Sequence, residues 1–199
     1  MRHRRGEGHR LRAEIITAAT ALLERSGTEE TISLRAVANA AGIATTSIYL
    51  HFDDREALLW AVAEAQFGEL DSAMAATDPE AAPIERLRAA ALAYCRFGLE
   101  RPGPYRIMFG ATRTPKQHRD FEDLPGAAAF ERLHACVREL APDESFATTT
   151  AIWAALHGIV SLRATMQHFP WQSVAELVDV VIHAHCDARS AASDTAPGI

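Results

Sequence analysis

The 199-residue sequence predicts an all-α protein, and three observations support this fold class. Hydrophobic residues make up 48% of the chain and charged residues 23%, a balance typical of a globular protein with a normal core. Aromatic residues are sparse at 7%, alanine is abundant, and no alternating run of β-branched residues predicts a strand. Apolar residues recur at helical spacing between prolines and glycines. We therefore expect about nine helices: three in a small N-terminal domain, then a C-terminal helical bundle.

The first expected helix covers residues 10–26, and Gly27 follows it as a stop signal. Its apolar face consists of Leu11, Ile15, Ala18, Ala19, Leu22 and Leu23. The first twelve residues hold five Arg and one Glu. We interpret residues 1–9 as a basic arm, disordered on its own, that could clamp phosphate or follow a groove; a merely solvated tail is the alternative.

Two short amphipathic helices separated by a glycine follow within residues 32–60, ISLRAVANAAGIATTSIYLHFDDREALLW. Ser33 is placed to cap the first of them, and Gly42 allows the chain to reverse, because glycine adopts a left-handed conformation without steric penalty. Ile43 and Ile48 face the first helix, which leaves small or polar side chains outward. This pattern is typical of a helix-turn-helix, whose second helix enters the DNA major groove. Two packed helices of an ordinary all-α protein are the alternative.

The segment resembles the DNA-binding domain of the TetR family of bacterial transcriptional regulators. The resemblance covers residues 10–60: the first helix, then TISLRAVANAAGI, then SIYLHFDDREALL, where a Tyr, a His-Phe pair and a short acidic turn lead into a long fourth helix. The resemblance implies a DNA-contacting surface on the second and third helices and the start of the fourth. Its candidate residues are Ser33, Arg35, Ala44, Thr45, Thr46, Ser47, Tyr49, His51 and Arg55.

Individual roles on this surface also follow from the resemblance. Thr45, Thr46 and Ser47 would open the recognition helix toward bases and phosphates. Tyr49 and His51 would hydrogen-bond the phosphate backbone, although Tyr49 has packing as an alternative role. Arg55 occupies a place where the family often has a Lys that touches phosphate.

Three further residues concern the helix ends. The carboxylate of Asp54 is expected to cap the fourth helix, where the helix dipole favours negative charge. Ala44 departs from the family pattern, in which a capping Ser is frequent, and losing such a cap costs on the order of 1 kcal/mol. Phe52 is interpreted as a buried wedge that joins the small domain to the fourth helix.

Charge is distributed unevenly along the chain. The formal net charge is −6, yet residues 1–60 hold eight Arg against eight acidic residues, so the remaining residues carry all of the −6. Neutralisation of phosphate by basic residues provides much of any DNA affinity. The relative enrichment of Arg therefore favours a nucleic-acid contact at the N-terminus.

The lengths of the apolar runs and the number of cysteines indicate the cellular location of the protein. No apolar stretch reaches the roughly 18 residues of a membrane span, and the Arg-rich start lacks the apolar core of a secretion signal. Cys95, Cys136 and Cys186 are odd in number and far apart, which suits reduced thiols. We expect a cytoplasmic protein that does not contact membranes.

Beyond the third helix, prolines and glycines divide the chain into further helices. Expected ranges are 54–76, 83–100, 105–109, a helix through 130–140, 146–169 and 174–185, with residues 112–126 as a loop. The last two helices carry apolar surface that needs more than one neighbour, because residues 146–169 are apolar nearly all round. We therefore predict a two-fold homodimer through the last two helices, which would read a palindromic site with two recognition helices.

The run WAALHGIVSL at 153–162 and the run RPGPYRIMF resemble one branch of the TetR family, marked by Trp, His and Gly in its C-terminal ligand-binding domain. This resemblance implies a small, largely apolar effector bound between helices four to eight that moves the fourth helix and alters the distance between recognition helices. Candidate ligand-binding residues combine apolar surface with polar tips. They are Phe67, Tyr94, Phe97, Tyr105, Phe130, His134, Trp153 and His157, each with plain core packing as the alternative.

Enzymatic and metal sites are not supported by the sequence. There is no Gly-rich phosphate loop, GxSxG or CxxC motif, and no cofactor is expected. His183, His185 and Cys186 point to different sides of a helix, and His183 with Asp187 makes only two ligands, so we predict no metal site.

The sequence thus predicts a transcriptional regulator that is not an enzyme. Its expected parts are a disordered arm (1–9), a helix-turn-helix domain (10–53), a ligand-binding and dimerisation domain (54–190) and a disordered tail (191–199). We expect a repressor that a small apolar or amphipathic effector releases from a palindromic operator. The alternative is a DNA-binding regulator without such an effector, controlled by a protein partner or by abundance.

Overall fold

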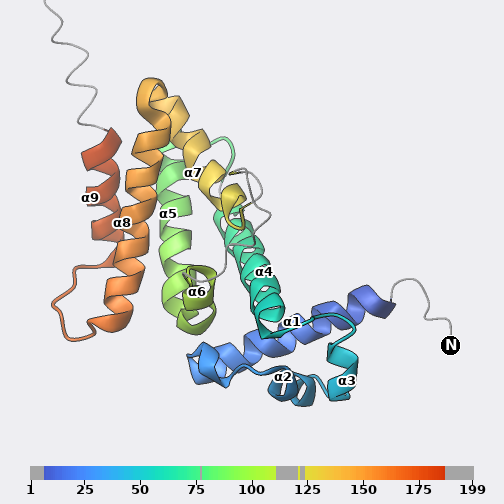
Figure 1. Ribbon diagram of the computed structural model, residues 1–199. Coiled ribbons are helices and arrows are strands. Elements are labelled where there is room, and N and C mark those ends of the chain that lie inside the picture. Colours follow the sequence, from blue (N-terminus) through green and yellow to red (C-terminus); the bar gives the residue numbers. More distant parts are fainter. Residues whose placement is uncertain (1–6, 77, 111–120, 122–123, 187–199) are drawn as a thin grey trace, which may run out of the picture. The chain divides into compact units, whose positions relative to one another are not determined.

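The computed structural model describes residues 7–76, 78–110, 121 and 124–186. These residues form nine α-helices and no strand, which confirms the expected all-α class (Figure 1). The helices are α1 (Glu7–Ser26), α2 (Leu34–Ala40), α3 (Thr45–Ile48), α4 (Arg55–Ala75), α5 (Pro83–Glu100), α6 (Pro102–Met108), α7 (Ala127–Leu140), α8 (Ser145–Thr165) and α9 (Val174–Cys186).

Several boundaries differ from the sequence-based expectations. Helix α1 begins at Glu7 instead of residue 10, so part of the expected basic arm is helical; residues 1–6 lie outside the described residues. Helix α6 begins at Pro102, three residues before the expected start, because proline fits the first turn of a helix without losing a needed N–H. Helix α8 ends at Thr165 instead of residue 169. Most of the expected 112–126 loop and the tail after residue 186 lie outside the described residues.

The chain divides into two compact units. The N-terminal unit comprises residues 1–67 together with 101–125, so helix α6 belongs to it although α6 lies beyond the expected 10–53 domain. Its core is built by α1, α2, α3 and the first half of α4. Fully buried members include Ile15, Leu23, Val37, Ile48 and Leu58.

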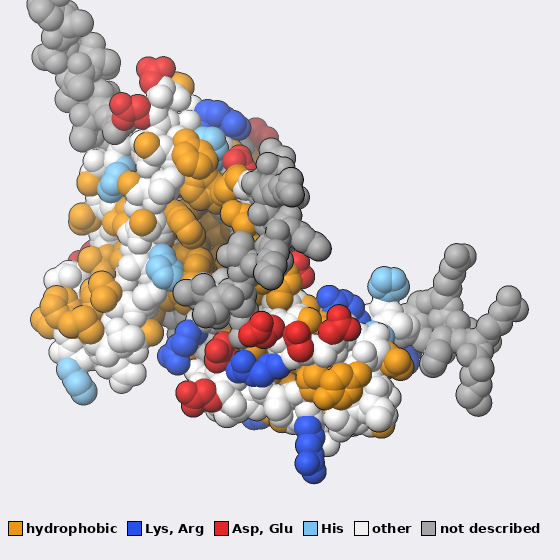
Figure 2. All heavy atoms as spheres, in the orientation of Figure 1, with side chains coloured by type: hydrophobic (Ala, Val, Ile, Leu, Met, Phe, Trp, Pro, Cys, Tyr) orange, Lys and Arg blue, Asp and Glu red, His pale blue; other side chains and the backbone are white. Residues whose placement is uncertain are grey.

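The C-terminal unit comprises residues 68–100 and 126–199, and in it α5, α7, α8 and α9 pack together. Its core side chains are Leu87, Tyr94, Leu133, Ile152, Leu156, Val178 and Ile182. Ion pairs at the edges join neighbouring helices: Arg86 NH2 lies 2.6 Å from Glu139 Oε2, and the guanidinium of Arg88 contacts both carboxylate oxygens of Asp179. Figure 2 shows apolar side chains gathered over this unit.

One stretch of the described chain, Pro142–Thr165, is long and apolar enough to cross a membrane by length and composition alone, with a mean hydropathy of 1.3. The sequence analysis expected no such stretch, because it looked for an unbroken run of apolar residues. The mean hydropathy of this stretch is high even though polar residues such as Thr interrupt it. Core helices of globular proteins pass the same test, and one such helix is weak support for a span. The stretch includes α8, which packs against α5, α7 and α9.

Candidate nucleic-acid interface

The start of helix α2 is capped as the sequence predicts. Ser33 has extended backbone angles, and its Oγ accepts a hydrogen bond of 3.1 Å from the N–H of Ala36. Leu34 and Val37 are buried against the core of the N-terminal unit, whereas Arg35 is exposed. The helix is thus fixed from one side and presents Arg35 on the other.

The turn after α2 reverses at Gly42, whose φ is +68°. The N–H of Ile43 donates to the carbonyl of Ala38 over 3.0 Å, which closes the turn. A side chain other than glycine would be strained at this φ, because a Cβ crowds the backbone in the left-handed region. The predicted glycine-hinged turn is confirmed.

Helix α3 is one turn long and is anchored to the core by one buried side chain. Ile48 is fully buried, while Thr46 is exposed and Thr45 and Ser47 are half-buried. Ala44 stands at the N-cap and makes no side-chain hydrogen bond, as the departure from the family pattern predicts. The helix therefore holds its short hydroxyl side chains at the surface through a single buried anchor and backbone bonds.

The residues after α3 continue the exposed surface. Tyr49 is 55% exposed, which disfavours the alternative that it mainly packs, and His51 is half-buried. Leu50 is 77% exposed, and the sequence reasoning had not singled it out. Leu50 lies between Tyr49 and His51, where no regular helical pattern of apolar residues continues, so its exposure could not be predicted from the sequence. We call residues 44–51 the recognition surface.

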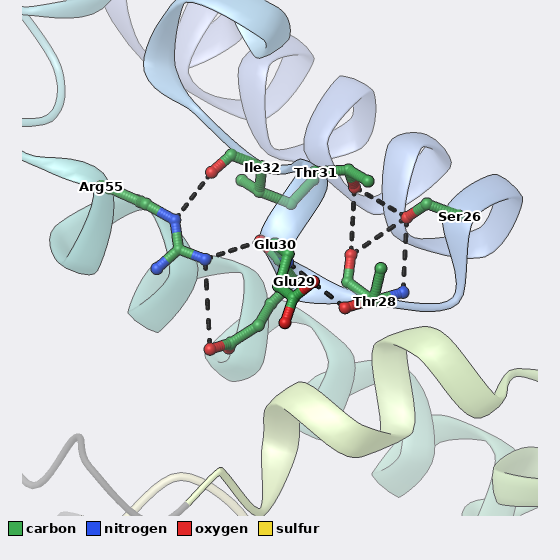
Figure 3. Close-up of polar contacts among 7 residues, drawn as sticks. All are labelled: Ser26, Thr28, Glu29, Glu30, Thr31, Ile32 and Arg55. Carbon is green, nitrogen blue, oxygen red and sulfur yellow. Dashed lines mark hydrogen bonds and ion pairs between the residues drawn. The ribbon is translucent and has the colours of Figure 1, made fainter.

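Arg55 at the start of α4 is half-buried and points toward the chain segment before α2 (Figure 3). Its Nε donates to the carbonyl of Ile32 at 2.7 Å, and its NH2 donates to the carbonyl of Glu29 at 2.6 Å. The carboxylate of Glu29 lies 4.0 Å away. Arg55 therefore ties the α1–α2 connection to α4, a structural role that the resemblance did not imply; its phosphate contact stays a prediction.

Two further expectations about this region are confirmed. Asp54 Oδ1 accepts a 2.7 Å hydrogen bond from the N–H of Ala57 and so caps α4. Phe52 is 2% exposed, and the Arg12 guanidinium lies 4.5 Å from the centre of its ring, within range of a cation–π contact. On the face that Figure 2 shows, basic and acidic side chains lie side by side over the N-terminal unit, in keeping with its balanced charge.

The predicted ligand-binding residues fall into both units and are only partly brought together. In the N-terminal unit, Phe109 contacts Phe67 edge-on with ring centroids 5.4 Å apart and lies 5.0 Å from Tyr105. Tyr94 and Phe97 of α5 are buried in the C-terminal unit. These contacts equally suit the plain packing that was the alternative for each residue.

An aromatic cluster on α7 and α8 unites three of the predicted ligand-binding residues. The Phe130 ring lies 6.1 Å from Trp153, 6.0 Å from His134 and 5.3 Å from Phe146, measured between centroids. His134 Nε2 is 3.1 Å from the Ser145 hydroxyl. The cluster thus combines apolar rings with a polar edge, as small-molecule sites do.

His157 and Thr148 add polar groups to α8. Burial lowers the pKa of His157 below its ordinary value, and its Nε2 lies 3.2 Å from the hydroxyl of Ser161. Thr148 is 3% exposed, and its Oγ1 has no hydrogen-bond partner among the described residues. Sequence reasoning missed Thr148, because nothing in an apolar helix marks which threonine turns inward.

The sequence analysis also predicted that the cysteines are reduced and that there is no metal site. Cys95 and Cys136 are buried free thiols, and burial raises the pKa of Cys95 to about 12, so this thiol stays protonated. Among the described residues, no group of three His, Cys, Asp or Glu side chains is placed to hold a metal ion. Asp187, the suggested partner of His183, lies outside those residues.

Fold and surface together define a helix-turn-helix protein, and comparisons with known proteins give its family. A family model for bacterial regulatory proteins of the tetR family matches residues 15–62. A second model, the Tetracyclin repressor-like C-terminal domain, matches residues 87–185. The chain therefore belongs to the TetR family of transcriptional regulators, a family of DNA-binding regulators. The Trp-His-Gly branch stays a prediction, since neither model description names it.

Solved structures show the same fold. A protein of unknown function from Rhodococcus sp. RHA1 shares 27% identity at a TM-score of 0.74, covering 89% of this chain and 94% of that one. A putative TetR-family transcriptional regulator from Mesorhizobium loti shares 19% sequence identity at a TM-score of 0.66. The match covers 92% of this chain and 98% of that one. A TetR transcriptional regulator from Streptomyces coelicolor shares 19% sequence identity at a TM-score of 0.69, and the match covers 89% of this chain and 96% of that one. No curated protein matches the sequence.

Proposed function

We propose that the protein binds a palindromic operator in the cytoplasm and represses transcription by occupying it. The observation that carries this proposal is the recognition surface: Ile48 anchors α3, while Thr46 and Tyr49 stand exposed. Short hydroxyl groups at the start of a recognition helix can donate to or accept from base edges and phosphates. Arg35 lies exposed on the preceding helix and supplies positive charge for phosphate.

A homodimer through α8 and α9 completes this function. Exposed large apolar side chains on or next to these helices are Phe146, Leu162, Met166, Phe169 and Val180. Ala147 and Ala154 are exposed on α8 and would let a partner backbone approach closely. Apolar surface of this kind in one chain is typical of an interface. Two-fold pairing would give the two recognition helices a symmetric arrangement that matches a palindrome.

A small apolar or amphipathic effector would regulate the dimer. The aromatic cluster of Phe130, Trp153 and Phe146, with His134 at its edge, supports this part of the proposal. The unpartnered hydroxyl of Thr148 would gain a hydrogen bond from such a compound. An effector shifts the DNA affinity only if it prefers one of two arrangements of the protein.

Selection of bound sequences from a random duplex pool tests the DNA-binding proposal. We expect wild-type protein to enrich a palindrome with half-sites about one helical turn apart. Thr46→Ala should change the base preference at specific positions, because it removes a hydroxyl that contacts base edges. A uniform loss of affinity across all sequences would show that Thr46 contacts only the backbone.

Titration with apolar and amphipathic compounds, followed by tryptophan fluorescence, tests the effector. Trp153 lies in the aromatic cluster and should report occupancy there. A compound that changes the fluorescence should also change operator affinity. A panel without any response, in a protein that binds its operator, would favour the alternative in which a protein partner or abundance controls the regulator.

A further inference from the structure

Leu50 is the most exposed large apolar side chain among the described residues. Its exposed fraction is 77%, and the next largest is that of Val180, with 65%. A single leucine on the surface of a globular protein requires no explanation by itself. Leu50, however, lies within the recognition surface, next to the exposed Tyr49. An apolar side chain at this place meets whatever the recognition surface binds.

The backbone around Leu50 continues the helical turn of α3 beyond its last residue. The N–H of Leu50 donates to the carbonyl of Ser47 over 3.2 Å. The N–H of Phe52 donates to the carbonyl of Ile48 over 3.0 Å, and both of these side chains are buried. Hydrogen bonds therefore fix the backbone of this segment, and two apolar anchors hold it to the core of the N-terminal unit.

The other face of this turn carries Thr46 and Leu50, which are both exposed. Residues four apart in sequence lie on the same face of a helix. Leu50 is therefore presented to the same groove as Thr46, the residue to which the proposed function assigns a base contact. One helical turn advances about 5.4 Å, and base pairs are stacked about 3.4 Å apart, so the two side chains should meet bases one or two pairs apart.

The chemistry of leucine restricts what Leu50 can recognise in DNA. Its side chain has no hydrogen-bonding atom, so it cannot pair with a donor or an acceptor of a base. The apolar group that bases present in the major groove is the 5-methyl group of thymine. Adenine, guanine and cytosine present donors and acceptors there, which a leucine would cover without replacing their hydrogen bonds to water.

We propose that Leu50 contacts the 5-methyl group of one thymine in each half-site and so helps to determine the base sequence of the operator. The inference rests on the proposed function and deepens it, because it assigns a specificity-determining residue to one chemical group of the DNA. The contact removes apolar surface of both partners from water, which is favourable.

Duplexes that carry the operator from the random-pool selection, with deoxyuridine in place of one thymine at a time, test this contact. Deoxyuridine lacks the 5-methyl group but keeps the hydrogen-bonding pattern of thymine. Wild-type protein should lose about three- to fivefold in affinity at one thymine of each half-site, the effect of one methyl group removed from water. That thymine should lie about one or two base pairs from the position at which Thr46→Ala changes the base preference.

Three variants assign the effect to the side chain. Leu50→Ala should bind the thymine and the deoxyuridine duplexes equally well, with an unchanged melting temperature, because alanine does not reach the methyl group. Leu50→Met, which keeps an apolar side chain of similar volume, should retain the wild-type loss. The matched control is Leu124→Ala, which truncates another exposed leucine of the N-terminal unit, outside the recognition surface. It should show the full wild-type loss.

Two results overturn the inference. One is a Leu50→Ala protein that loses as much affinity on the deoxyuridine duplex as the wild type does, since another side chain then contacts the methyl group. The other is an operator in which no thymine methyl group affects wild-type binding. Wild-type protein that binds no duplex at all would instead refute the proposed function, and the inference with it.

Discussion

At the scale of single residues, the N-terminal unit depends on side chains that hold backbone atoms. Arg55 reaches the carbonyls of both Glu29 and Ile32, and Ser33 and Asp54 each bind a free N–H at a helix start. These bonds satisfy backbone groups that helix geometry leaves without partners. The orientation of α2 and of α4 is therefore set by a few polar side chains as well as by the apolar core.

Arg55→Lys tests the structural role of this guanidinium. Lysine keeps the positive charge but has no planar fork for two carbonyls. We expect the free energy of unfolding to fall by about 1–2 kcal/mol, in the range of a hydrogen bond to a charged group. Urea denaturation measures this change. Arg35→Lys, at an exposed position, should leave the stability unaltered, and an equally unaltered Arg55→Lys would remove the structural role.

His157→Gln tests the effect of a half-buried imidazole on acid stability. Burial lowers the pKa of His157, so the unfolded chain binds a proton more readily than the folded one. The folded protein should therefore lose stability as the pH falls below about 6.5, the ordinary histidine value. In His157→Gln, the difference in unfolding free energy between pH 7.5 and pH 5 should shrink. His168→Gln, at an exposed position, should retain the wild-type difference in the same denaturation series.

At the scale of secondary-structure elements, α2 and α3 differ in how they begin. Ser33 caps α2 with its hydroxyl, whereas Ala44 offers none to α3. Helix α3 is also a single turn, so it has few internal hydrogen bonds of its own. Its stability in the free protein thus depends on the buried Ile48 and on the Gly42 turn.

Ala44→Ser should stabilise the start of α3. Residue 44 already has the extended backbone angles, φ −65° and ψ 139°, that an N-cap serine adopts. The new hydroxyl should raise the free energy of unfolding by about 1 kcal/mol. Ser33→Ala is the converse change, and it should lower that energy by about the same amount. Thermal and urea unfolding of both variants give the comparison, and no gain in Ala44→Ser would mean that the cap does not form.

At the scale of the whole molecule, the two units have different chemical surfaces. The N-terminal unit presents polar side chains on its recognition surface, whereas α8 and α9 present apolar ones such as Leu162 and Val180. The first kind of surface suits a polyanion and the second suits a second copy of the chain. The function that we propose requires both surfaces in one protein.

Leu162→Glu combined with Val180→Glu should convert the proposed dimer into a monomer. Burying two carboxylates in an apolar interface without partners is strongly unfavourable. Light scattering at micromolar concentration should show half the mass of the wild-type particle. Operator affinity should fall to that of a single half-site. Arg138→Glu, an exposed charge change on α7, should stay dimeric; a glutamate double variant that also stays dimeric would locate the interface elsewhere.

Local interactions determined what the sequence alone could predict. Caps at Ser33 and Asp54, the turn at Gly42 and the amphipathic ranges of the helices depend on residues a few positions apart, so they could be read from spacing. The same is true of the exposed position of Thr46 on the recognition surface. The inward turn of Thr148 and the exposure of Leu50 were not readable, because neighbours distant in sequence decide them.

Tertiary structure alone decided which distant segments meet. It assigned α6 to the N-terminal unit, placed Arg55 on two backbone carbonyls over twenty residues away, and put Gly103 against Leu23. Nothing in the local sequence distinguishes an arginine that binds phosphate from one that binds a carbonyl, since both need the same donors. The physical reason is that several acceptors in the chain are chemically suitable for each donor. Only the folded structure decides which of them lies within hydrogen-bond distance.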